Sequence, residues 1–236
     1  MDIKRTAKSG RDSLQLGIYA VINPFVRMLI KIGVTPNMVT TIGFLGNLAA
    51  AVVFVAAGMQ ENTDPTAAAG NYWMLTLGGA LIIGFSLFDM LDGQVARLGG
   101  MSTTFGAMYD SVLDRYCELL TLGGIAFYLL ESGDLTGALI TFVALVGSIM
   151  VSYVRARAEG LDIECKIGFM QRPERVVVTA LGALAAGLAG SMQEPGDSFD
   201  PNVILIAAMS VIAVFANLTA FARLAHCRRQ LTSSGK

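Results

Sequence analysis

Four aspartates in the middle of this 236-residue chain have the spacing of a shared binding site. Asp89 and Asp92 are three residues apart, and Asp110 and Asp114 are four residues apart, so each pair faces one side of a helix. The connection between the pairs is short and contains adjacent glycines at 99–100, which favours two antiparallel neighbouring helices. We therefore expect the four carboxylates to converge on one cavity.

Four negative charges in one cleft repel one another strongly unless cations neutralise them. Ligand sets made only of oxygen, with no His or Cys close by, favour Mg²⁺ or Mn²⁺ over zinc. Mg²⁺ in particular binds through a few carboxylates together with substrate phosphates. The pattern thus predicts two divalent ions and a substrate that carries a diphosphate.

Two other interpretations of the aspartates remain open on spacing alone. The carboxylates could line an ion or proton pathway of a transporter, because acidic groups at the edge of a membrane span often mark such a path. They could also pair with Arg97 and Arg115 as structural salt bridges.

The elements that position these residues are predicted from hydrophobicity. The chain is 54% hydrophobic and only 15% charged, and it contains 26 glycines, a composition typical of a membrane protein. Backbone polar groups find no partner in hydrocarbon, so long apolar runs are expected to be helices. Six runs are long enough to span a bilayer, at residues 37–58, 72–91, 111–130, 136–154, 174–193 and 202–222. The predicted fold is an all-α integral membrane bundle of six transmembrane helices.

The basic residues predict the orientation of this bundle. All 17 Lys and Arg residues fall in the N-terminal segment, in residues 97–115, in residues 155–175 or in the C-terminal tail. The connections near residues 59–71, 131–135 and 194–201 contain none. The positive-inside rule then places both termini and the aspartates on the cytoplasmic side of the cytoplasmic (inner) membrane. The net charge of −1 gives no reason to expect a nucleic-acid partner.

The polar N-terminus lacks a cleavable signal, and residues 14–31 have apolar side chains at near-helical spacing. Pro24, Arg27 and Lys31 argue against a seventh span, so we predict an N-terminal interfacial amphipathic helix. The whole chain, 1–236, is interpreted as a single membrane domain. It comprises a cytoplasmic N-terminus with the interfacial helix at 1–33, the six-helix bundle at 34–224 and a cytoplasmic tail at 225–236.

The three cysteines are odd in number and lack the spacing of metal ligands. Cys117, Cys165 and Cys227 are therefore expected to be reduced thiols that fill space in the fold.

Residues 89–114 match the pattern D-x2-D-G-x2-A-R-x8-G-x3-D-x3-D at all eight of its fixed positions. This segment resembles the signature of the CDP-alcohol phosphotransferase family. The resemblance implies a membrane-embedded helical enzyme that uses divalent metal ions to transfer a substituted phosphoryl group from a CDP-activated lipid to an alcohol.

The resemblance also implies roles for individual residues. Asp89, Asp92 and Asp110 would be the principal metal ligands, and Asp114 the general base that also takes part in metal binding. Some residues around the cytidine diphosphate would be small enough to accommodate the cytidine, and others would contact its phosphates. This predicted CDP-lipid site comprises Pro36, Asn37, Thr40, Asp92, Gly93, Ala96, Arg97 and Gly106. The segment around Pro36 resembles a family element at the start of the first span, and it also has the character of a simple helix start.

Five arginines are candidates for the alcohol site. The segments R-A-R-A-E at 155–159 and Q-R-P-E-R at 171–175 resemble K-A-R-A-E and E-R-P-E-R of the prokaryotic phosphatidylinositol-phosphate synthases, each with one departure at its first position. The resemblance implies an acceptor that carries its own phosphate, which guanidinium groups can bind in a forked geometry. The predicted acceptor-phosphate residues are Arg155, Arg157, Arg172, Arg175 and Arg223.

The expected reaction transfers a phosphatidyl group from CDP-diacylglycerol to inositol 1-phosphate, with release of CMP. Glycerol 3-phosphate, serine or another alcohol is the alternative acceptor, and an ion transporter is the remote alternative function. The expected partners are these substrates, membrane lipid and a second copy of the chain, with small residues such as Ala183 and Gly187 available to pack a homodimer.

Overall fold

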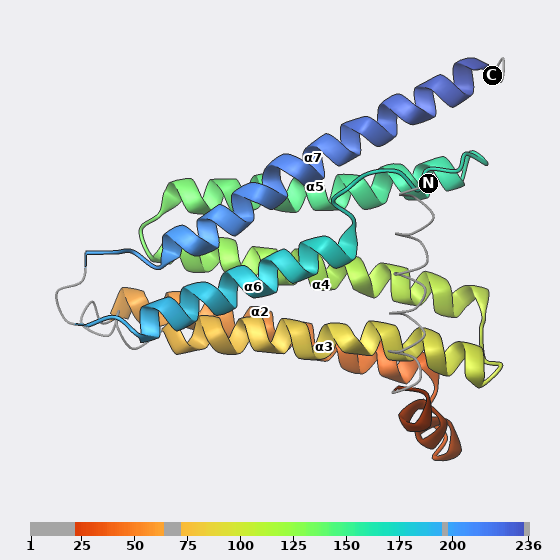
Figure 1. Cartoon of the computed structure of the whole chain (residues 1–236), viewed down its shortest axis with the longest axis horizontal. Helices are drawn as coiled ribbons and strands as arrows, with labels where there is room; N and C mark the ends of the chain where they lie inside the picture. The colour runs from red at the N-terminus through yellow and green to blue at the C-terminus, as the bar shows by residue number, and fades with distance from the viewer. Residues whose placement is uncertain (1–21, 64–71, 195–197, 234–236) are drawn as a thin grey trace, which may run out of the picture. The chain divides into compact units, whose positions relative to one another are not determined.

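The computed structural model describes residues 22–63, 72–194 and 198–233 (Figure 1). Within these ranges every regular element is a helix, and residues 22–31 form the first of them. The other helices are α2 (Pro36–Thr63), α3 (Tyr72–Leu98), α4 (Thr104–Glu131), α5 (Leu135–Glu159), α6 (Arg172–Ser191) and α7 (Asn202–Ser233).

Five of the described helices are long and apolar enough to cross a membrane, namely α2, α3, α5, α6 and α7. The chain is therefore an integral membrane protein whose described residues form only helices as regular elements, as its composition predicts. Helix α4 has 28 residues, but it is not among the five. Its charged residues are Asp110, Asp114, Arg115, Glu118 and Glu131. The prediction of six spans is thus confirmed for five of them by length and composition, and α4 as the sixth stays a prediction.

The helices begin and end at residues that local chemistry favours. Thr35 precedes α2, and its hydroxyl accepts a hydrogen bond of 3.4 Å from the Met38 amide, while Pro36 occupies the first helical position. Between α3 and α4 the chain turns at Gly100, whose φ of +62° suits glycine. Asp134 caps α5 by accepting a hydrogen bond of 2.6 Å from the Gly137 amide. The short glycine turn predicted between the two aspartate pairs is present.

The helices divide into two compact units, which we describe separately. The first unit contains the chain up to Gly43 and the segment Leu87–Leu113. Its core consists of Val26, Val39 and Val95, which are at most 2% exposed. The helix at residues 22–31 therefore packs through Val26 against the first turns of α2 and the last turns of α3. Part of the interfacial helix predicted at 14–31 lies outside the described residues.

The second unit contains Phe44–Ser86 and the chain from Asp114 onward. Its core is apolar, with Phe54, Leu75, Ile125 and Leu205 fully buried. Helix α7 packs against α5 and α6, and Figure 1 shows α5 and α7 running in the same direction while α6 runs the opposite way. Tyr128 of α4 donates a buried hydrogen bond of 2.8 Å to Oδ1 of Asn202 at the start of α7.

Small residues let the helices of the second unit approach closely. A Cβ atom on Gly187 of α6 would lie 2.6 Å from the carbonyl oxygen of Tyr72 in α3. Ala183, one turn earlier on α6, has no exposed surface. The suggestion that Ala183 and Gly187 pack a dimer is therefore wrong, because both residues pack inside a single chain.

Candidate active site

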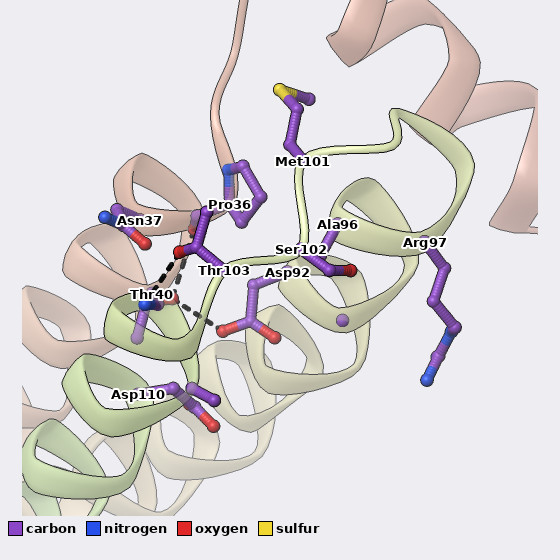
Figure 2. Close-up of a pocket in the computed structure, with 13 residues that line it drawn as sticks. Pro36, Asn37, Thr40, Asp92, Ala96, Arg97, Met101, Ser102, Thr103 and Asp110 are labelled. Atoms are coloured by element: carbon purple, nitrogen blue, oxygen red, sulfur yellow. Dashed lines mark hydrogen bonds between the residues drawn. The ribbon is translucent and has the colours of Figure 1, made fainter.

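A pocket of about 250 Å³ lies in the first unit, between the start of α2, the end of α3 and the start of α4 (Figure 2). All eight residues of the predicted CDP-lipid site line this pocket, and Asp110 lines it too. The wall is completed by Met101, Ser102, Thr103 and Ala107, which were not predicted. These four belong to the connection between the aspartate pairs and the first turn of α4, so the short length of that connection was the signal that could have included them.

Asp92 is held in the pocket by Thr40. The Thr40 hydroxyl donates a hydrogen bond of 2.7 Å to Oδ2 of Asp92, and Figure 2 shows the two side chains facing each other from α2 and α3. Asp92 is only 6% exposed. A buried carboxylate needs such a donor or a cation, because loss of hydration is costly for a charged group.

Asp89 and Asp110 bring two further carboxylates together in the same unit. One carboxylate oxygen of Asp89 lies within 4.8 Å of one from Asp110, and both residues are half-buried. Carboxylate oxygens this close can share one divalent cation after a small adjustment of the side chains, because each ligand oxygen lies about 2.1 Å from the ion. The donors are all oxygen, which fits Mg²⁺ or Mn²⁺. Asp92 is not part of this close group.

Position 106, beside this pocket, has room only for a small residue such as the glycine found there. A Cβ atom there would lie 3.0 Å from Oγ1 of Thr103 and 3.3 Å from Oδ1 of Asn37. A larger residue would therefore push against the wall that Asn37 forms. At Gly93, in contrast, an added Cβ would meet Arg97 only at 3.6 Å, an ordinary contact.

Asp114 lies one helical turn after Asp110 on α4 and belongs to the second unit. Its Oδ1 atom is 2.7 Å from a terminal nitrogen of Arg172, the first residue of α6. Arg115 approaches the other carboxylate oxygen at 3.9 Å. Asp114 is therefore a carboxylate flanked by cations, whose negative charge is stabilised.

The predicted acceptor arginines fall into two groups. Arg155 and Arg157 lie on the last turns of α5, where Arg157 is exposed and Arg155 forms an ion pair of 2.9 Å with Glu159. Arg172 at the start of α6 is partly exposed and bound to Asp114. These three side chains are at least partly exposed, so a ligand can reach them without unfolding of the chain.

Arg175 and Arg223 are instead buried and bonded inside the protein. Each is 2% exposed. Arg175 forms a bidentate pair with Glu118 and donates a further bond of 3.1 Å to the Met170 carbonyl. Arg223 donates to the carbonyls of Ile167 and Val151, each at 2.7 Å. Their guanidinium groups hold the backbone around residues 160–171 to α4, α5 and α7.

Sequence reasoning did not single out Glu118. It lies one turn after Asp114 on α4 and is 8% exposed. An acidic residue in phase with Asp110 and Asp114 on a largely apolar helix was the signal that could have found it.

The model of the family described as CDP-alcohol phosphatidyltransferase matches residues 33–216. This match contains the pocket and the four aspartates of the motif. The chain belongs to the CDP-alcohol phosphatidyltransferase family. Membership makes it a transferase of substituted phosphate groups.

Several curated relatives carry the name phosphatidylinositol phosphate synthase. The protein from Mycobacterium marinum is 35% identical over 164 residues, which are 69% of this chain and 64% of the relative. The chain thus matches somewhat less than two thirds of that relative's length. The protein from Mycobacteroides abscessus is 32% identical over 216 residues, covering 91% of this chain and 86% of the relative.

Solved structures of the Mycobacterium tuberculosis phosphatidylinositol phosphate synthase have a similar fold. The structure with CDP-DAG bound has a TM-score of 0.72 at 29% identity and covers 88% of this chain and 94% of that one. The structure in complex with manganese and citrate has a TM-score of 0.71 at 29% identity, with coverages of 86% and 87%.

Proposed function

We propose that this chain transfers the phosphatidyl group of CDP-diacylglycerol to inositol 1-phosphate, releasing CMP and forming phosphatidylinositol phosphate. The observation that carries the proposal is the pocket in the first unit, which contains every residue of the predicted CDP-lipid site. The relatives from M. marinum and M. abscessus, named as phosphatidylinositol phosphate synthases, support the choice of acceptor.

Asp89, Asp92 and Asp110 are proposed to hold two divalent ions, Mg²⁺ or Mn²⁺, with Asp114 contributing from the next turn of α4. Support comes from the short separation of the Asp89 and Asp110 oxygens and from manganese in the related M. tuberculosis structure. When bound, such ions neutralise charge on the diphosphate of the donor and on the departing CMP. The carboxylates offer only oxygen donors, which disfavours metal ions that prefer nitrogen or sulfur ligands.

The side chains around the pocket are proposed to bind the CDP part of the lipid. Gly93 and Ala96 leave space for the cytidine, and Arg97 provides positive charge for its phosphates. Asn37 and Thr40 at the start of α2 close the opposite wall, and Gly106 keeps that wall in place. These residues position the donor so that its phosphorus can be attacked.

Asp114 is proposed to be the general base that takes the proton from the attacking hydroxyl of the acceptor. Its neighbour Arg172 places a positive charge 2.7 Å from the carboxylate, on the side where the acceptor phosphate is proposed to bind. We propose that Arg155, Arg157 and Arg172 bind the phosphate of the acceptor, since their side chains reach solvent. Arg175 and Arg223 donate hydrogen bonds to groups of the protein itself. We propose that they hold the backbone near this site in position and do not bind the acceptor.

The proposed topology has six membrane spans, with α4 as the third, and an interfacial helix near the N-terminus. The termini and the active site face the cytoplasm, as the position of the basic residues favours. The active form is proposed to be a homodimer. Its contact surface must differ from the Ala183 and Gly187 face of α6, which is used within the chain.

The acceptor is tested with the purified protein in lipid nanodiscs supplied with CDP-diacylglycerol and Mg²⁺. Inositol 1-phosphate, inositol, glycerol 3-phosphate and serine are added in separate reactions, and CMP release is recorded. We expect inositol 1-phosphate to stimulate release more than any other acceptor. If only glycerol 3-phosphate or serine stimulates CMP release, that compound replaces inositol 1-phosphate as the assigned acceptor. The reaction type of the family is unaffected by this outcome.

The phosphate site is tested with Arg157→Ala. The variant removes an exposed cation from the last turn of α5, so the KM for inositol 1-phosphate should rise about tenfold or more while the KM for CDP-diacylglycerol stays the same. Arg228→Ala is the matched control, because Arg228 is an exposed arginine near the end of α7 that has no proposed role. An unchanged acceptor KM in Arg157→Ala contradicts this assignment.

A further inference from the structure

Helices α4 and α6 are joined by two ion pairs that repeat along both helices. Asp114 binds Arg172, with 2.7 Å between Oδ1 and the terminal nitrogen. One turn further along α4, Glu118 binds Arg175, with 2.9 Å between Oε2 and a terminal nitrogen and a second contact to Nε. The spacing is four residues on α4 and three residues on α6, so both contacts join the same helix faces.

The two ion pairs differ in their exposure to solvent. The side chains of Arg172 and Asp114 are 24% and 15% exposed, whereas those of Arg175 and Glu118 are 2% and 7% exposed. The outer pair can therefore exchange partners with a ligand, and the inner pair cannot do so without exposing buried charge. An isolated buried charge is strongly unfavourable, which makes the inner pair a fixed contact.

Arg175 also fixes the segment in front of α6. One of its terminal nitrogens donates a bond of 3.1 Å to the carbonyl of Met170, and the Met170 side chain is part of the apolar core. Gln171 and Arg172 follow directly in the sequence. The guanidinium of Arg175 thus determines the position of the backbone from which Arg172 extends.

We propose that Glu118 and Arg175 form a positioning pair that holds Arg172 against Asp114, and that Arg175 does not contact the acceptor itself. This inference rests on the proposed function, because it assigns Asp114 as the base and Arg172 as a phosphate ligand. Glu118 has no other proposed role in the reaction. The pair acts on the acceptor side of the site and leaves the CDP pocket of the first unit unchanged.

The test is a double-mutant cycle on the full chain in nanodiscs with Mg²⁺. Glu118→Gln removes the charge with little change of shape, and Arg175→Lys keeps the charge but loses the forked geometry. Each single variant should lower kcat/KM for inositol 1-phosphate by about 100-fold, because small misplacements of reacting groups have effects of this size. The KM for CDP-diacylglycerol should change by less than about threefold.

The double variant decides between positioning and direct contact. If the two residues act as one unit, the double variant is no slower than either single variant. If Arg175 instead binds the acceptor phosphate directly, Arg175→Lys is impaired, Glu118→Gln has near wild-type acceptor kinetics, and the inference is overturned. Independent effects that multiply in the double variant overturn it as well.

Two controls separate positioning from general loss of structure. Tyr128→Phe removes another buried polar contact of α4, to Asn202, and should leave the acceptor kinetics within about threefold of wild type. Hydrogen exchange should increase in the segment 168–178 of Glu118→Gln and stay unchanged in α7 residues 205–216. If a single variant loses its thermal transition, Glu118→Asp replaces Glu118→Gln, with the same expected direction.

The double-mutant cycle on Glu118 and Arg175 still tests the positioning pair if the proposed acceptor is wrong. If the wild-type protein is inactive with inositol 1-phosphate but active with glycerol 3-phosphate or serine, the acceptor assignment is overturned. The cycle is then measured with the active acceptor, and non-additivity supports the positioning pair as before. Unchanged exchange at 168–178 in Glu118→Gln overturns the positioning role whichever acceptor is used.

Discussion

The hydroxyl of Thr40 donates a hydrogen bond of 2.7 Å to Oδ2 of Asp92, which joins the first turns of α2 to the last turns of α3. Thr40 and Asp92 are 5% and 6% exposed, so water has little access to this bond. The bond engages one carboxylate oxygen of Asp92, a residue that lines the pocket (Figure 2). A residue outside the aspartate motif therefore determines how one of its aspartates presents its charge.

Thr40→Val should impair the donor side of the reaction. Valine has nearly the same shape but cannot donate, and an unsatisfied buried polar group costs about 1–3 kcal/mol. We expect kcat/KM for CDP-diacylglycerol to fall about tenfold, measured by CMP release at saturating acceptor. Thr40→Ser keeps the hydroxyl and should stay within about threefold of wild type. Equal rates in the valine and serine variants would show that Asp92 does not depend on this bond.

Asp114→Asn should nearly abolish turnover while the protein stays folded. The amide cannot accept a proton, and loss of a general base lowers rates by about 10²–10⁴. The measurement is single-turnover CMP release together with the thermal transition in nanodiscs. Asp134→Asn is the matched control, because Asp134 caps α5 and asparagine caps helices equally well. Substantial turnover by Asp114→Asn would remove its assignment as the base.

Removal of divalent cations should stop the reaction reversibly. Treatment with EDTA is expected to abolish CMP release, and Mg²⁺ or Mn²⁺ should restore it. Zn²⁺ should not, because Asp89, Asp92 and Asp110 offer only oxygen ligands. Circular dichroism should show the helices unchanged throughout, since the cores of both units are apolar. Full activity after exhaustive chelation would contradict a metal-dependent mechanism.

The thiol of Cys165 should react slowly with alkylating reagents at neutral pH. Burial raises the pKa of the Cys165 thiol above its ordinary value, and the neighbouring Cys227 thiol raises it further. A raised pKa leaves less of the reactive thiolate at pH 7, so the rate should increase as the pH rises toward the alkaline range. The rate is measured with a maleimide on a variant that retains only Cys165, in which burial, the larger of the two causes, remains.

The comparison is a second variant that retains only Cys227, whose side chain is partly exposed. Cys165 is 1% exposed, so its labelling should be at least about tenfold slower than that of Cys227 at pH 7.5. Similar rates at the two positions would show that the segment around Cys165 opens readily.

The helices and the pocket were predictable because their signals are local. Continuous apolar runs indicate spans, Thr35 and Pro36 indicate the start of α2, and the glycines at 99–100 indicate the turn between α3 and α4. The motif spacing placed Asp92 and Asp110 at the same pocket. The resemblance to the family added the residues at the start of α2, which line that pocket too.

The arginines were harder to assign because their roles depend on contacts between distant segments. Arg172 and Arg175 lie in one short motif with the same residue type, yet one is partly exposed and the other is 2% exposed. The difference arises from Glu118, which lies 57 residues before Arg175 in the chain. Likewise, Arg223 donates to carbonyls 56 and 72 residues away, and a backbone carbonyl has no signature in a sequence.

Arg223 joins helix α7 to the segment between α5 and α6. Its guanidinium donates a hydrogen bond to the Ile167 carbonyl, and its own carbonyl oxygen is 3.9 Å from the Cys165 sulfur. Helix α7 therefore contacts the segment between α5 and α6 at two points. Any outward swing of that segment to admit a bulky alcohol must break these contacts or carry the end of α7 along. A spectroscopic label attached near residue 230 would then report on entry and exit at a site whose ligands are all elsewhere in the sequence.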